Sequence, residues 1–467
     1  MVPRVSISNY KSIKRVSLDL QPGLNILIGP NGSGKTCLLS ALKFLRDFFR
    51  VGAAQALALQ GGARRAFHHG ESEMSFSITQ NYGYRTFHRQ KISSEFHWAV
   101  VISQAGQEEL PTITSEVLSI IGEPNTNRAR LFEVTITRTG EQTTTELFLA
   151  PSSEFGADLF SRWISKYGRV SKAMMGAEFR AHLSTQLSSL ELLPDRSCFP
   201  LLAPFDSVIG DTYERFQLLN EYNIVPDTAR ASTEQLPFAQ MAPNGAAVSE
   251  VIHALENKRF HKLLMRPIES DDIFGHDNPY WWTFSSRGTA QKYADALDNI
   301  NRELSAAVKP ITRVSVEVDP TNGKRFVVFY FGTEKFYAQE VSDGTVKWLC
   351  ILVSLFVPIS KVYLLEEPEN FLHPWMQQRL IEIMRGQAKK NRTVFLLSSH
   401  SATILNSARP EEILIVRHSD EGTHVSAIDD LVSIREVLSQ SDFHLGDLWV
   451  SGAIGGVPTD DGHNSRR

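Results

Sequence analysis

Residues 29–36 read Gly-Pro-Asn-Gly-Ser-Gly-Lys-Thr, and they constrain the fold of this chain more than any other segment. A short apolar run, Leu24–Ile28, precedes them, and a segment with helical periodicity, Leu38–Phe49, follows. A glycine-rich turn between a buried strand and a helix points backbone N–H groups and the helix N-terminus at one anion. Every position of the G-x-x-x-x-G-K-[ST] phosphate-binding loop (P-loop) is filled. The sequence therefore predicts an α/β fold built around a nucleotide phosphate site.

Within this loop the chemistry assigns separate roles to two side chains. Lys35 supplies a mobile cation for the β- and γ-phosphates, and Thr36 offers a hydroxyl to Mg²⁺. The motif alone is compatible with ATP or GTP. The predicted nucleotide-binding residues are Asn31, Gly32, Ser33, Gly34, Lys35, Thr36 and Cys37.

A second apolar run, Val362–Leu365, ends directly in acidic residues. A buried strand of a parallel sheet delivers such residues to its carboxyl edge, where ligands of α/β proteins bind. We expect Glu366 to hold Mg²⁺, directly or through water. Glu367 is expected to polarise the attacking water as general base, with Glu369 as the alternative base.

Two further segments carry candidate residues for the same site. The apolar run Thr393–Leu397 leads into His400, which at the end of a neighbouring strand can reach the γ-phosphate. Ser342 and Gly344 open an apolar helix 24 residues before Glu366, and a serine at a helix N-terminus favours an anion.

In this order, the segments GPNGSGKT, SDGT, LLEEPENFLHP and SSHSATIL resemble an ABC-type ATPase head, of the branch that includes SMC, RecF and OLD proteins. The resemblance covers roughly residues 1–50 and 340–406. In that family two heads meet head-to-tail, and each ATP lies between one P-loop and the partner's signature loop. Two features depart from the common pattern: the first acid is Glu366 instead of Asp, and the signature is SDGT instead of SGGE or SGGQ.

The resemblance implies a role for each matching residue. Ser342 and Gly344 would contact the γ-phosphate of the partner's ATP, Glu367 would be the catalytic base, and His400 would be the switch histidine. Residues 370–373 would cross the dimer interface. A glutamine after an early strand usually completes the Mg²⁺ site; Gln80 is the candidate, and an ordinary surface glutamine is the alternative reading.

The fold class expected from these patterns is an α/β ABC-type head with an N-terminal antiparallel β subdomain and a mostly helical insertion. Residues 1–150 would hold the P-loop and the β subdomain, and 151–310 the insertion, with helices over Phe155–Leu193 and Ala246–Met265. Residues 311–457 would complete the head, and 458–467 would be a disordered tail. The insertion contains many prolines and no heptads, which excludes a long coiled-coil arm.

Composition narrows the setting of this protein. The 467 residues carry a net charge of −4, which does not suit a wholly basic nucleic-acid coat. The three cysteines are too few for a disulfide scaffold, so we expect a reducing, cytoplasmic environment. No apolar stretch reaches the ~18 residues that span a bilayer, and no membrane partner is expected.

The 67 residues after His400 are too few for the TOPRIM nuclease of an OLD protein. The chain therefore resembles ATPase subunits of two-gene anti-phage systems, the PARIS ATPase AriA first and the Septu ATPase PtuA second. This resemblance implies an ATPase that forms homo-oligomers through ATP-sandwich dimers and senses a phage trigger. It would control a separate TOPRIM effector nuclease. The alternative is a RecF-like repair ATPase that loads on DNA.

For two further segments the sequence leaves the role undecided. Lys258, Arg259, Lys262 and Arg266 on a predicted helix can contact DNA phosphates or form an ordinary solvated face. The apolar, glycine-rich segment Gly446–Pro458 can dock a partner chain or pack on its own head.

Overall fold

The computed structural model describes residues 3–457, except 88–89, 105–109, 124–128, 140–141, 150–193, 204–206, 237–238, 260–292, 358–359 and 420–421. The chain forms two compact units that interleave along the sequence. The first unit contains residues 1–21, 32–217 and 417–425, and the second contains 22–31, 218–416 and 426–467.

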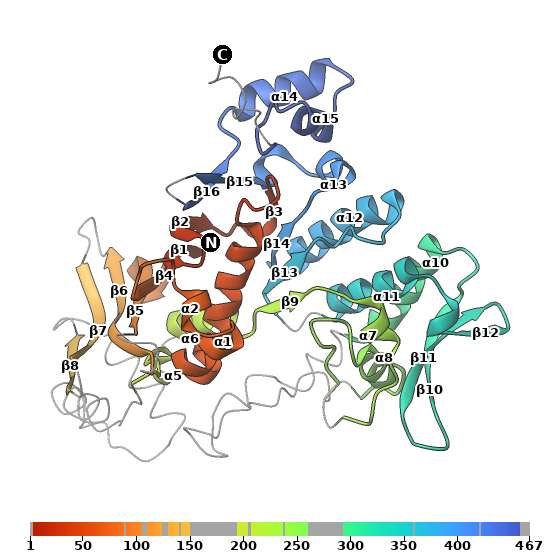
Figure 1. Cartoon of the computed structure of the whole chain (residues 1–467), viewed down its shortest axis with the longest axis horizontal. Coiled ribbons are helices and arrows are strands. Elements are labelled where there is room, and N and C mark those ends of the chain that lie inside the picture. Colours follow the sequence, from red (N-terminus) through yellow and green to blue (C-terminus); the bar gives the residue numbers. More distant parts are fainter. Residues whose placement is uncertain are drawn as a thin grey trace. The chain divides into compact units, whose positions relative to one another are not determined.

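A parallel sheet forms the centre of the second unit. Its strands lie in the order β15 (Ile413–Ser419), β3 (Gly23–Ile28), β14 (Val394–Ser398), β13 (Val362–Glu366) and β9 (Asn220–Tyr222). All of these neighbours pair in parallel (Figure 1). Strand β16 (Gly422–Ala427) follows at the β15 edge. Strands β13 and β14 are buried along nearly their whole length, which explains why they read as continuous apolar runs.

Helices pack on this sheet and continue the chain after it. Helix α12 (Pro374–Asn391) connects β13 to β14 and lies against β14 and β3. Pro374 occupies its first turn, where the missing N–H is not needed by the helix. Helix α13 (Ala402–Ser407) follows β14, and α14 (Leu431–Gln440) and α15 (Leu445–Val450) follow β16.

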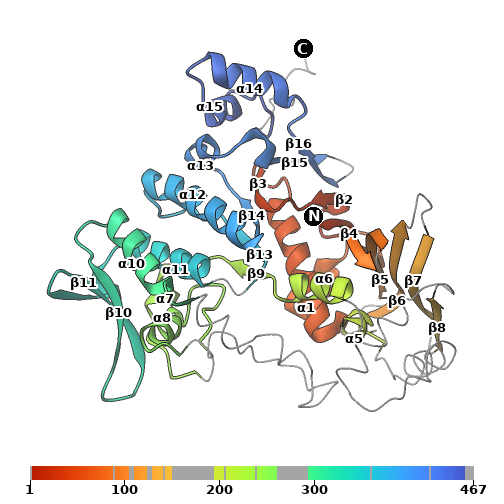
Figure 2. The same cartoon turned by 180° about the vertical axis from the view of Figure 1, so that it is seen from behind.

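The remaining elements of the second unit surround the helix that follows the signature segment. Helix α11 (Asp343–Phe356) contacts α7 (Pro226–Arg230), α8 (Val248–Glu256) and α10 (Ala296–Ala307). A three-stranded antiparallel sheet, β10 (Arg313–Val318), β11 (Arg325–Phe331) and β12 (Glu334–Tyr337), packs against α8 and α10 (Figure 2). Its first turn contains Gly323 at φ 72°, a left-handed conformation that glycine adopts without strain.

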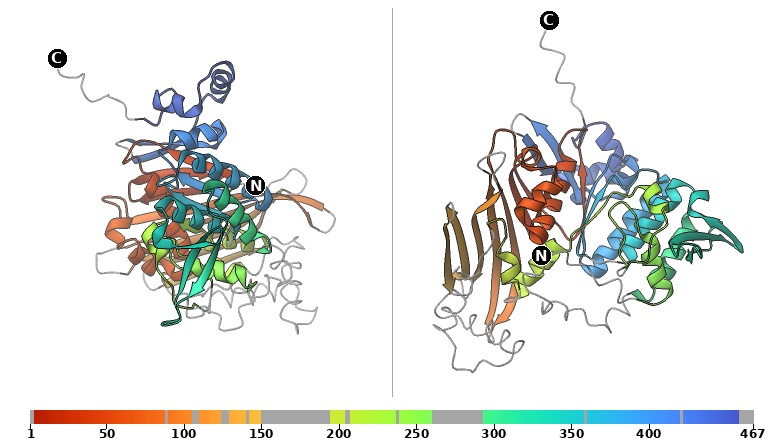
Figure 3. Two further views of the ribbon diagram at one scale, coloured as in Figure 1. Left: turned by 90° about the vertical axis from the view of Figure 1, so that its right-hand side faces the viewer. Right: turned by 60° about the horizontal axis from the view of Figure 1, so that its bottom comes forward.

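The first unit is an antiparallel sheet covered by a helix. Its strand order is β2-β1-β4-β5-β6-β7-β8, and α1 lies along one face (Figure 3). Short helices α2 (Ala63–Ala66), α5 (Phe199–Leu202) and α6 (Ser207–Gln217) complete the unit. The bounds are β1 Pro3–Tyr10, β2 Ile13–Asp19, α1 Lys35–Leu59, β4 Glu73–Phe87, β5 Gln90–Ser103, β6 Thr112–Glu123, β7 Ala129–Thr139 and β8 Gln142–Leu149.

Helix α1 bends at Gly52, where the backbone takes φ 83° and ψ 174°. The segment after the bend starts against Asp195, whose backbone oxygen accepts a hydrogen bond from Ala53 N at 2.9 Å. A Cβ at position 52 would meet the Asp195 carboxylate at 2.7 Å. Glycine is therefore required here by conformation and by space.

Most predicted elements appear near their expected positions, and the differences have physical causes. Of the helix expected over Ala246–Met265, the structure shows Val248–Glu256, which ends before Lys258 with its positive φ of 52°; residues 260–265 lie outside the described part. Residues 194–217, expected in the helical insertion, belong to the β-rich first unit. The helix expected over Phe155–Leu193 and the tail 458–467 lie outside the described residues. In the described part of the chain, no helix combines the length and the apolarity that crossing a membrane requires.

Candidate nucleotide-binding and hydrolysis site

The predicted site residues of the second unit gather at the carboxyl edge of its parallel sheet. In the strand register Leu27 lies opposite Ser398, and Ser398 lies opposite Glu366. The backbone N–H of Ser399 donates to the oxygen of Leu27 at 3.1 Å. The start of the P-loop, the acidic residues and the segment before His400 therefore leave the sheet at one edge.

The P-loop has the backbone that a phosphate cradle needs. Gly32 and Gly34 have φ values of 80° and 105°, which other residues adopt only with strain. A Cβ at Gly34 would collide with the side chain of Thr423. The hydroxyl of Ser33 is buried and has no hydrogen-bond partner among the described residues. An orphaned buried donor in this loop suits an anion that accepts from it.

The remaining predicted residues of the loop differ in exposure. Asn31 and Thr36 are exposed, whereas Lys35 is buried and Cys37 is half-buried. Lys35 and Thr36 start helix α1, whose N-terminal N–H groups have no intrahelical acceptors. The residues present thus fit a nucleotide phosphate and its Mg²⁺.

Glu367 lies in a tight turn directly after β13. Its φ of 41° is unusual for a residue with a side chain. Its N–H donates to the oxygen of Ser398 at 3.1 Å, and its Oε2 accepts from Asn370 Nδ2 at 2.9 Å. Its Oε1 lies 4.0 Å from His400 Nε2. Because the Glu367 side chain is 42% exposed, the carboxylate is oriented by protein and open to solvent.

Glu369 lies in a different environment, which does not favour the alternative that it acts as base. This residue is 8% exposed. Its Oε1 accepts hydrogen bonds from Ser399 Oγ and from the backbone N–H of His400, both at 2.7 Å. Glu369 therefore connects the turn after β13 to the loop after β14, and it is less open to solvent than Glu367.

Lys347 reaches the same turn from helix α11. Its Nζ donates to the backbone oxygen of Glu367 at 3.2 Å. Burial lowers the pKa of Lys347 to about 8, although the carboxylates of Glu369 and Glu367 act in the opposite direction. The helix that begins at the signature segment is thereby joined to the turn that carries the candidate base.

The signature segment forms the N-terminus of α11. Ser342 is its N-cap, and the Ser342 hydroxyl accepts from Thr345 N at 3.3 Å. A Cβ at Gly344 would meet the backbone oxygen of Phe371 at 2.5 Å. Ser342 and Phe371 are exposed, so the signature segment and the 370–373 segment present adjacent backbone to solvent.

The structure does not bring Gln80 together with Thr36. Gln80 lies on β4, on the same face as Phe76 and Ile78, and is 2% exposed. Phe76 stacks on Phe44 of α1, and Trp98, opposite Ile78, packs on Phe48. Phe48 comes thirteen positions after Lys35, which is about 20 Å of helix. Gln80 lies one step further along this row, so it is a buried sheet residue, neither a surface glutamine nor a neighbour of Thr36.

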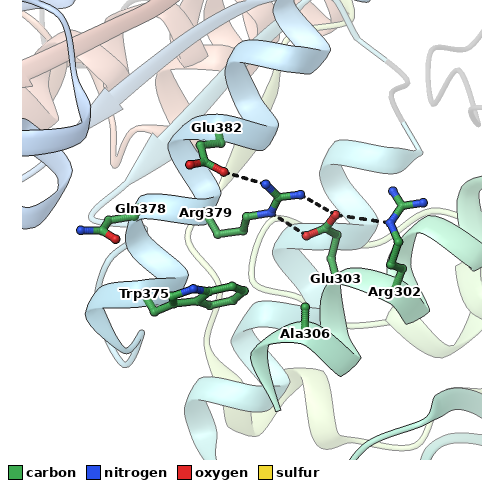
Figure 4. A pocket seen from close by; sticks show the side chains of 7 residues that line it. All are labelled: Arg302, Glu303, Ala306, Trp375, Gln378, Arg379 and Glu382. Carbon is green, nitrogen blue, oxygen red and sulfur yellow. Dashed lines mark hydrogen bonds and ion pairs between the residues drawn. The ribbon is translucent and has the colours of Figure 1, made fainter. Parts of the chain in front are cut away.

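An open hollow outside the predicted site lies between α10 and α12 (Figure 4). Arg379 crosses it and donates from Nε and Nη2 to the two carboxylate oxygens of Glu303, at 2.8 and 2.9 Å. Trp375, 42% exposed, forms one wall. The lining residues are Arg302, Glu303, Ala306, Trp375, Gln378, Arg379 and Glu382.

The structure describes only part of the two segments whose role the sequence left undecided, the basic residues from Lys258 and the segment Gly446–Pro458. Lys258 and Arg259 are exposed beyond the end of α8, while Lys262 and Arg266 lie outside the described residues. In the C-terminal segment Leu448 is buried, and Gly446 N donates to Asn406 Oδ1 at 2.7 Å. The described part of Gly446–Pro458 therefore packs on its own unit.

Sequence reasoning missed Lys347 as a member of the site and left Glu369 open as the alternative base. A lysine inside an otherwise apolar helix was the available signal for Lys347, because a charged residue there needs a partner. No local pattern distinguishes Glu369 from Glu367. Their surroundings differ in the structure: the hydroxyl of Ser399 and the backbone N–H of His400 donate hydrogen bonds to Glu369, whereas Glu367 faces the His400 ring.

Two family models match this chain. One is described as "AAA ATPase domain" and matches residues 1–160. The other is described as "AAA domain, putative AbiEii toxin, Type IV TA system" and matches residues 231–406. Together with the motifs at the sheet edge, these matches support an ATPase domain of the ABC/AAA type.

Particular relatives match over short segments. The chain is 36% identical over 78 residues to the DNA replication and repair protein RecF of Psychromonas ingrahamii, which is 17% of this chain and 20% of that protein. It is 38% identical over 66 residues to the DNA double-strand break repair Rad50 ATPase of Methanopyrus kandleri, which is 14% of this chain and 7% of that protein. The matches thus span a fifth or less of these relatives.

Solved SMC heads are similar over most of the chain at low identity. The SMC head bound to the C-terminal winged-helix domain of ScpA shows a TM-score of 0.44 and 11% identity, over 91% of this chain and 97% of that one. The Pyrococcus furiosus head with an extended coiled coil shows a TM-score of 0.41 and 11% identity, over 94% and 98%.

Proposed function

We propose that this chain binds ATP with Mg²⁺ at its P-loop and hydrolyses it in a head-to-tail dimer. Lys35, Thr36 and the backbone of 31–37 would hold the nucleotide, and Thr36 and Glu366 would hold the metal. Mg²⁺, when bound, neutralises charge on the phosphate oxygens. The observation that carries the proposal is the orientation of Glu367, whose carboxylate is fixed by Asn370 on one oxygen and faces His400 with the other.

In this proposal each residue performs one task. Glu367 accepts a proton from the attacking water through its exposed carboxylate. His400 lies beside it and responds to the γ-phosphate. Ser342 and Gly344, at the N-terminus of α11, provide N–H and hydroxyl groups for the γ-phosphate of the partner's ATP.

Two variants test the ATPase proposal. Lys35→Ala is expected to abolish ATP binding, measured by titration calorimetry, because the phosphate cation is lost. Glu367→Gln is expected to bind ATP, to hydrolyse it at least ~100-fold more slowly, and to accumulate a dimer or larger oligomer in light scattering. Glu436→Gln on α14, exposed and outside the site, is the matched control. Unchanged turnover in Glu367→Gln would contradict the assignment of the base.

We further propose that the ATPase is the sensor and scaffold subunit of a bacterial anti-phage system and controls a separate effector nuclease of the TOPRIM type. The resemblance to PARIS and Septu ATPase subunits supports this, and the AbiEii description of the model matching 231–406 is compatible with a two-component toxin system. Co-purification with the products of neighbouring genes, with and without ATP, tests it. The proposal would be contradicted if none of the neighbouring gene products co-purified and if cells carrying the locus remained fully sensitive to phage.

The RecF matches favour one alternative, an ATPase that loads on DNA. It predicts salt-dependent DNA binding that promotes ATP-driven dimerisation. Binding of short duplexes at two salt concentrations, with and without ATP, separates this function from control of an effector.

A further inference from the structure

The signature segment of this chain carries a negative charge at the place where, in the proposed function, the γ-phosphate of the partner's ATP must bind. Asp343 stands between Ser342 and Gly344, the two residues proposed to meet the partner's γ-phosphate. An uncompensated carboxylate at that point repels a nucleotide phosphate. As an acidic residue in the first turn, Asp343 also stabilises helix α11, so its presence has a local reason.

Arg230 of helix α7 lies against this carboxylate. Its Nη2 is 2.6 Å from Asp343 Oδ1 and donates to the backbone oxygen of Val341 at 3.0 Å. Its Nε donates to the backbone oxygen of Ala338 at 2.9 Å. One guanidinium therefore binds the chain on both sides of Ser342.

Contacts other than the one with Asp343 also hold Arg230 in place. The Arg230 side chain is 14% exposed, and its Nη1 is 3.1 Å from Asp227 Oδ1. The short helix α7 starts with Pro226, and the hydroxyl of Thr228 donates to the oxygens of Val225 and Asn244, at 2.8 and 2.7 Å. A guanidinium fixed in this way keeps its charge and its geometry.

We propose that Arg230 is a positioning residue that neutralises Asp343, so that the SDGT signature can accept the γ-phosphate of the partner's ATP. This inference rests on the proposed ATP-sandwich dimer. Asp227 leaves the charge of Arg230 available to Asp343, because the Asp227 side chain is 92% exposed and its charge is screened by water. The departure from the common signature is thereby compensated by a residue more than a hundred positions earlier in the chain.

The test measures ATP-driven self-association in the Glu367→Gln background by analytical ultracentrifugation. Arg230→Met keeps the length of the side chain and removes its charge. It is expected to weaken association with ATP about tenfold. The double variant Arg230→Met with Asp343→Asn is expected to recover to within about threefold of the parent. Arg4→Ala, which breaks an exposed bidentate pair with Asp19, is the matched control and should change nothing.

The outcomes separate the inference from the proposed function. If Glu367→Gln itself does not associate with ATP, the sandwich dimer is wrong. If it associates and the double variant stays as weak as Arg230→Met, neutralisation of Asp343 is overturned and Arg230 acts through its own charge or through the backbone of 338–341. Single-subunit ATP affinity, measured below the association range, and thermal unfolding show that each variant is folded. If Arg230→Met unfolds, Arg230→Gln replaces it, with the same loss and the same recovery by Asp343→Asn expected.

Discussion

The carboxylate of Glu369 accepts a hydrogen bond from the backbone N–H of His400 at 2.7 Å, and from the hydroxyl of Ser399 at the same distance. This buried connection joins the turn that carries Glu367 to the loop that carries His400. The two candidate catalytic side chains are consequently positioned by one acidic residue that is itself removed from solvent.

Glu369→Gln should keep ATP binding and lower turnover. The amide oxygen is a weaker acceptor than a carboxylate for the two hydrogen bonds, from the hydroxyl of Ser399 and from the backbone N–H of His400. We expect kcat to fall about tenfold, since a charge-assisted hydrogen bond contributes about 1.5–3 kcal/mol. Steady-state phosphate release and ATP titration measure the two quantities. Glu436→Gln is the control, and a loss of ATP affinity without a change in kcat would contradict a positioning role.

Lys347→Met should stabilise the protein near neutral pH and impair turnover. The pKa of Lys347 is lowered to about 8 by burial, so the protonated form is disfavoured in the folded state. Below pH 8 Lys347 is protonated in both the folded and the unfolded state, and the folded state is destabilised by the burial of this charge. Between about pH 8 and the ordinary lysine range the unfolded state binds more protons, so stability rises with pH.

The gain expected for Lys347→Met is therefore largest below pH 8, about 1–2 kcal/mol in the free energy of unfolding, and shrinks as pH rises toward 10. Urea unfolding at several pH values measures it. The exposed Lys390→Met on α12 is the control. A loss of stability at pH 7 would show that the hydrogen bond to Glu367 outweighs the burial of the charge.

Gly34→Ala should destabilise the first unit and abolish nucleotide binding. Alanine is strained at φ 105°, and its Cβ would collide with Thr423. We expect a loss of about 2–4 kcal/mol in the free energy of unfolding. Adding Thr423→Ala removes the colliding atoms and should restore about half of the loss, whereas Thr423→Ala alone is the control. Full recovery in the double variant would mean that the backbone angle is not strained.

Arg379→Ala should destabilise the protein, because the buried carboxylate of Glu303 loses its two hydrogen bonds from the Arg379 guanidinium. We expect a loss of about 1–3 kcal/mol, and the double variant with Glu303→Leu should recover most of it. The hydrogen bonds from Arg379 lower the pKa of Glu303. This contribution is present above the ordinary glutamate range and is lost as pH falls through the lowered value. Thermal unfolding at pH 7 and pH 3 should therefore show a smaller difference between wild type and Arg379→Ala at pH 3.

Much of the parallel sheet and of the P-loop is predictable from sequence. The runs Leu24–Ile28 and Val362–Leu365 become β3 and β13, and the glycines of the P-loop have the positive φ values that their chemistry requires. Such local signals survive because the burial of a strand and the conformational freedom of a glycine are properties of a few adjacent residues.

By itself, then, the sequence determined the phosphate loop, the acids after β13 and the histidine after β14. Only the tertiary structure decided how the candidate residues are used. It separated Glu367, which is open to solvent, from Glu369, which is tied to His400; it placed Lys347 under the turn; and it set Gln80 apart from Thr36. These roles depend on side chains that are distant in the chain and meet only through packing, so no local pattern encodes them.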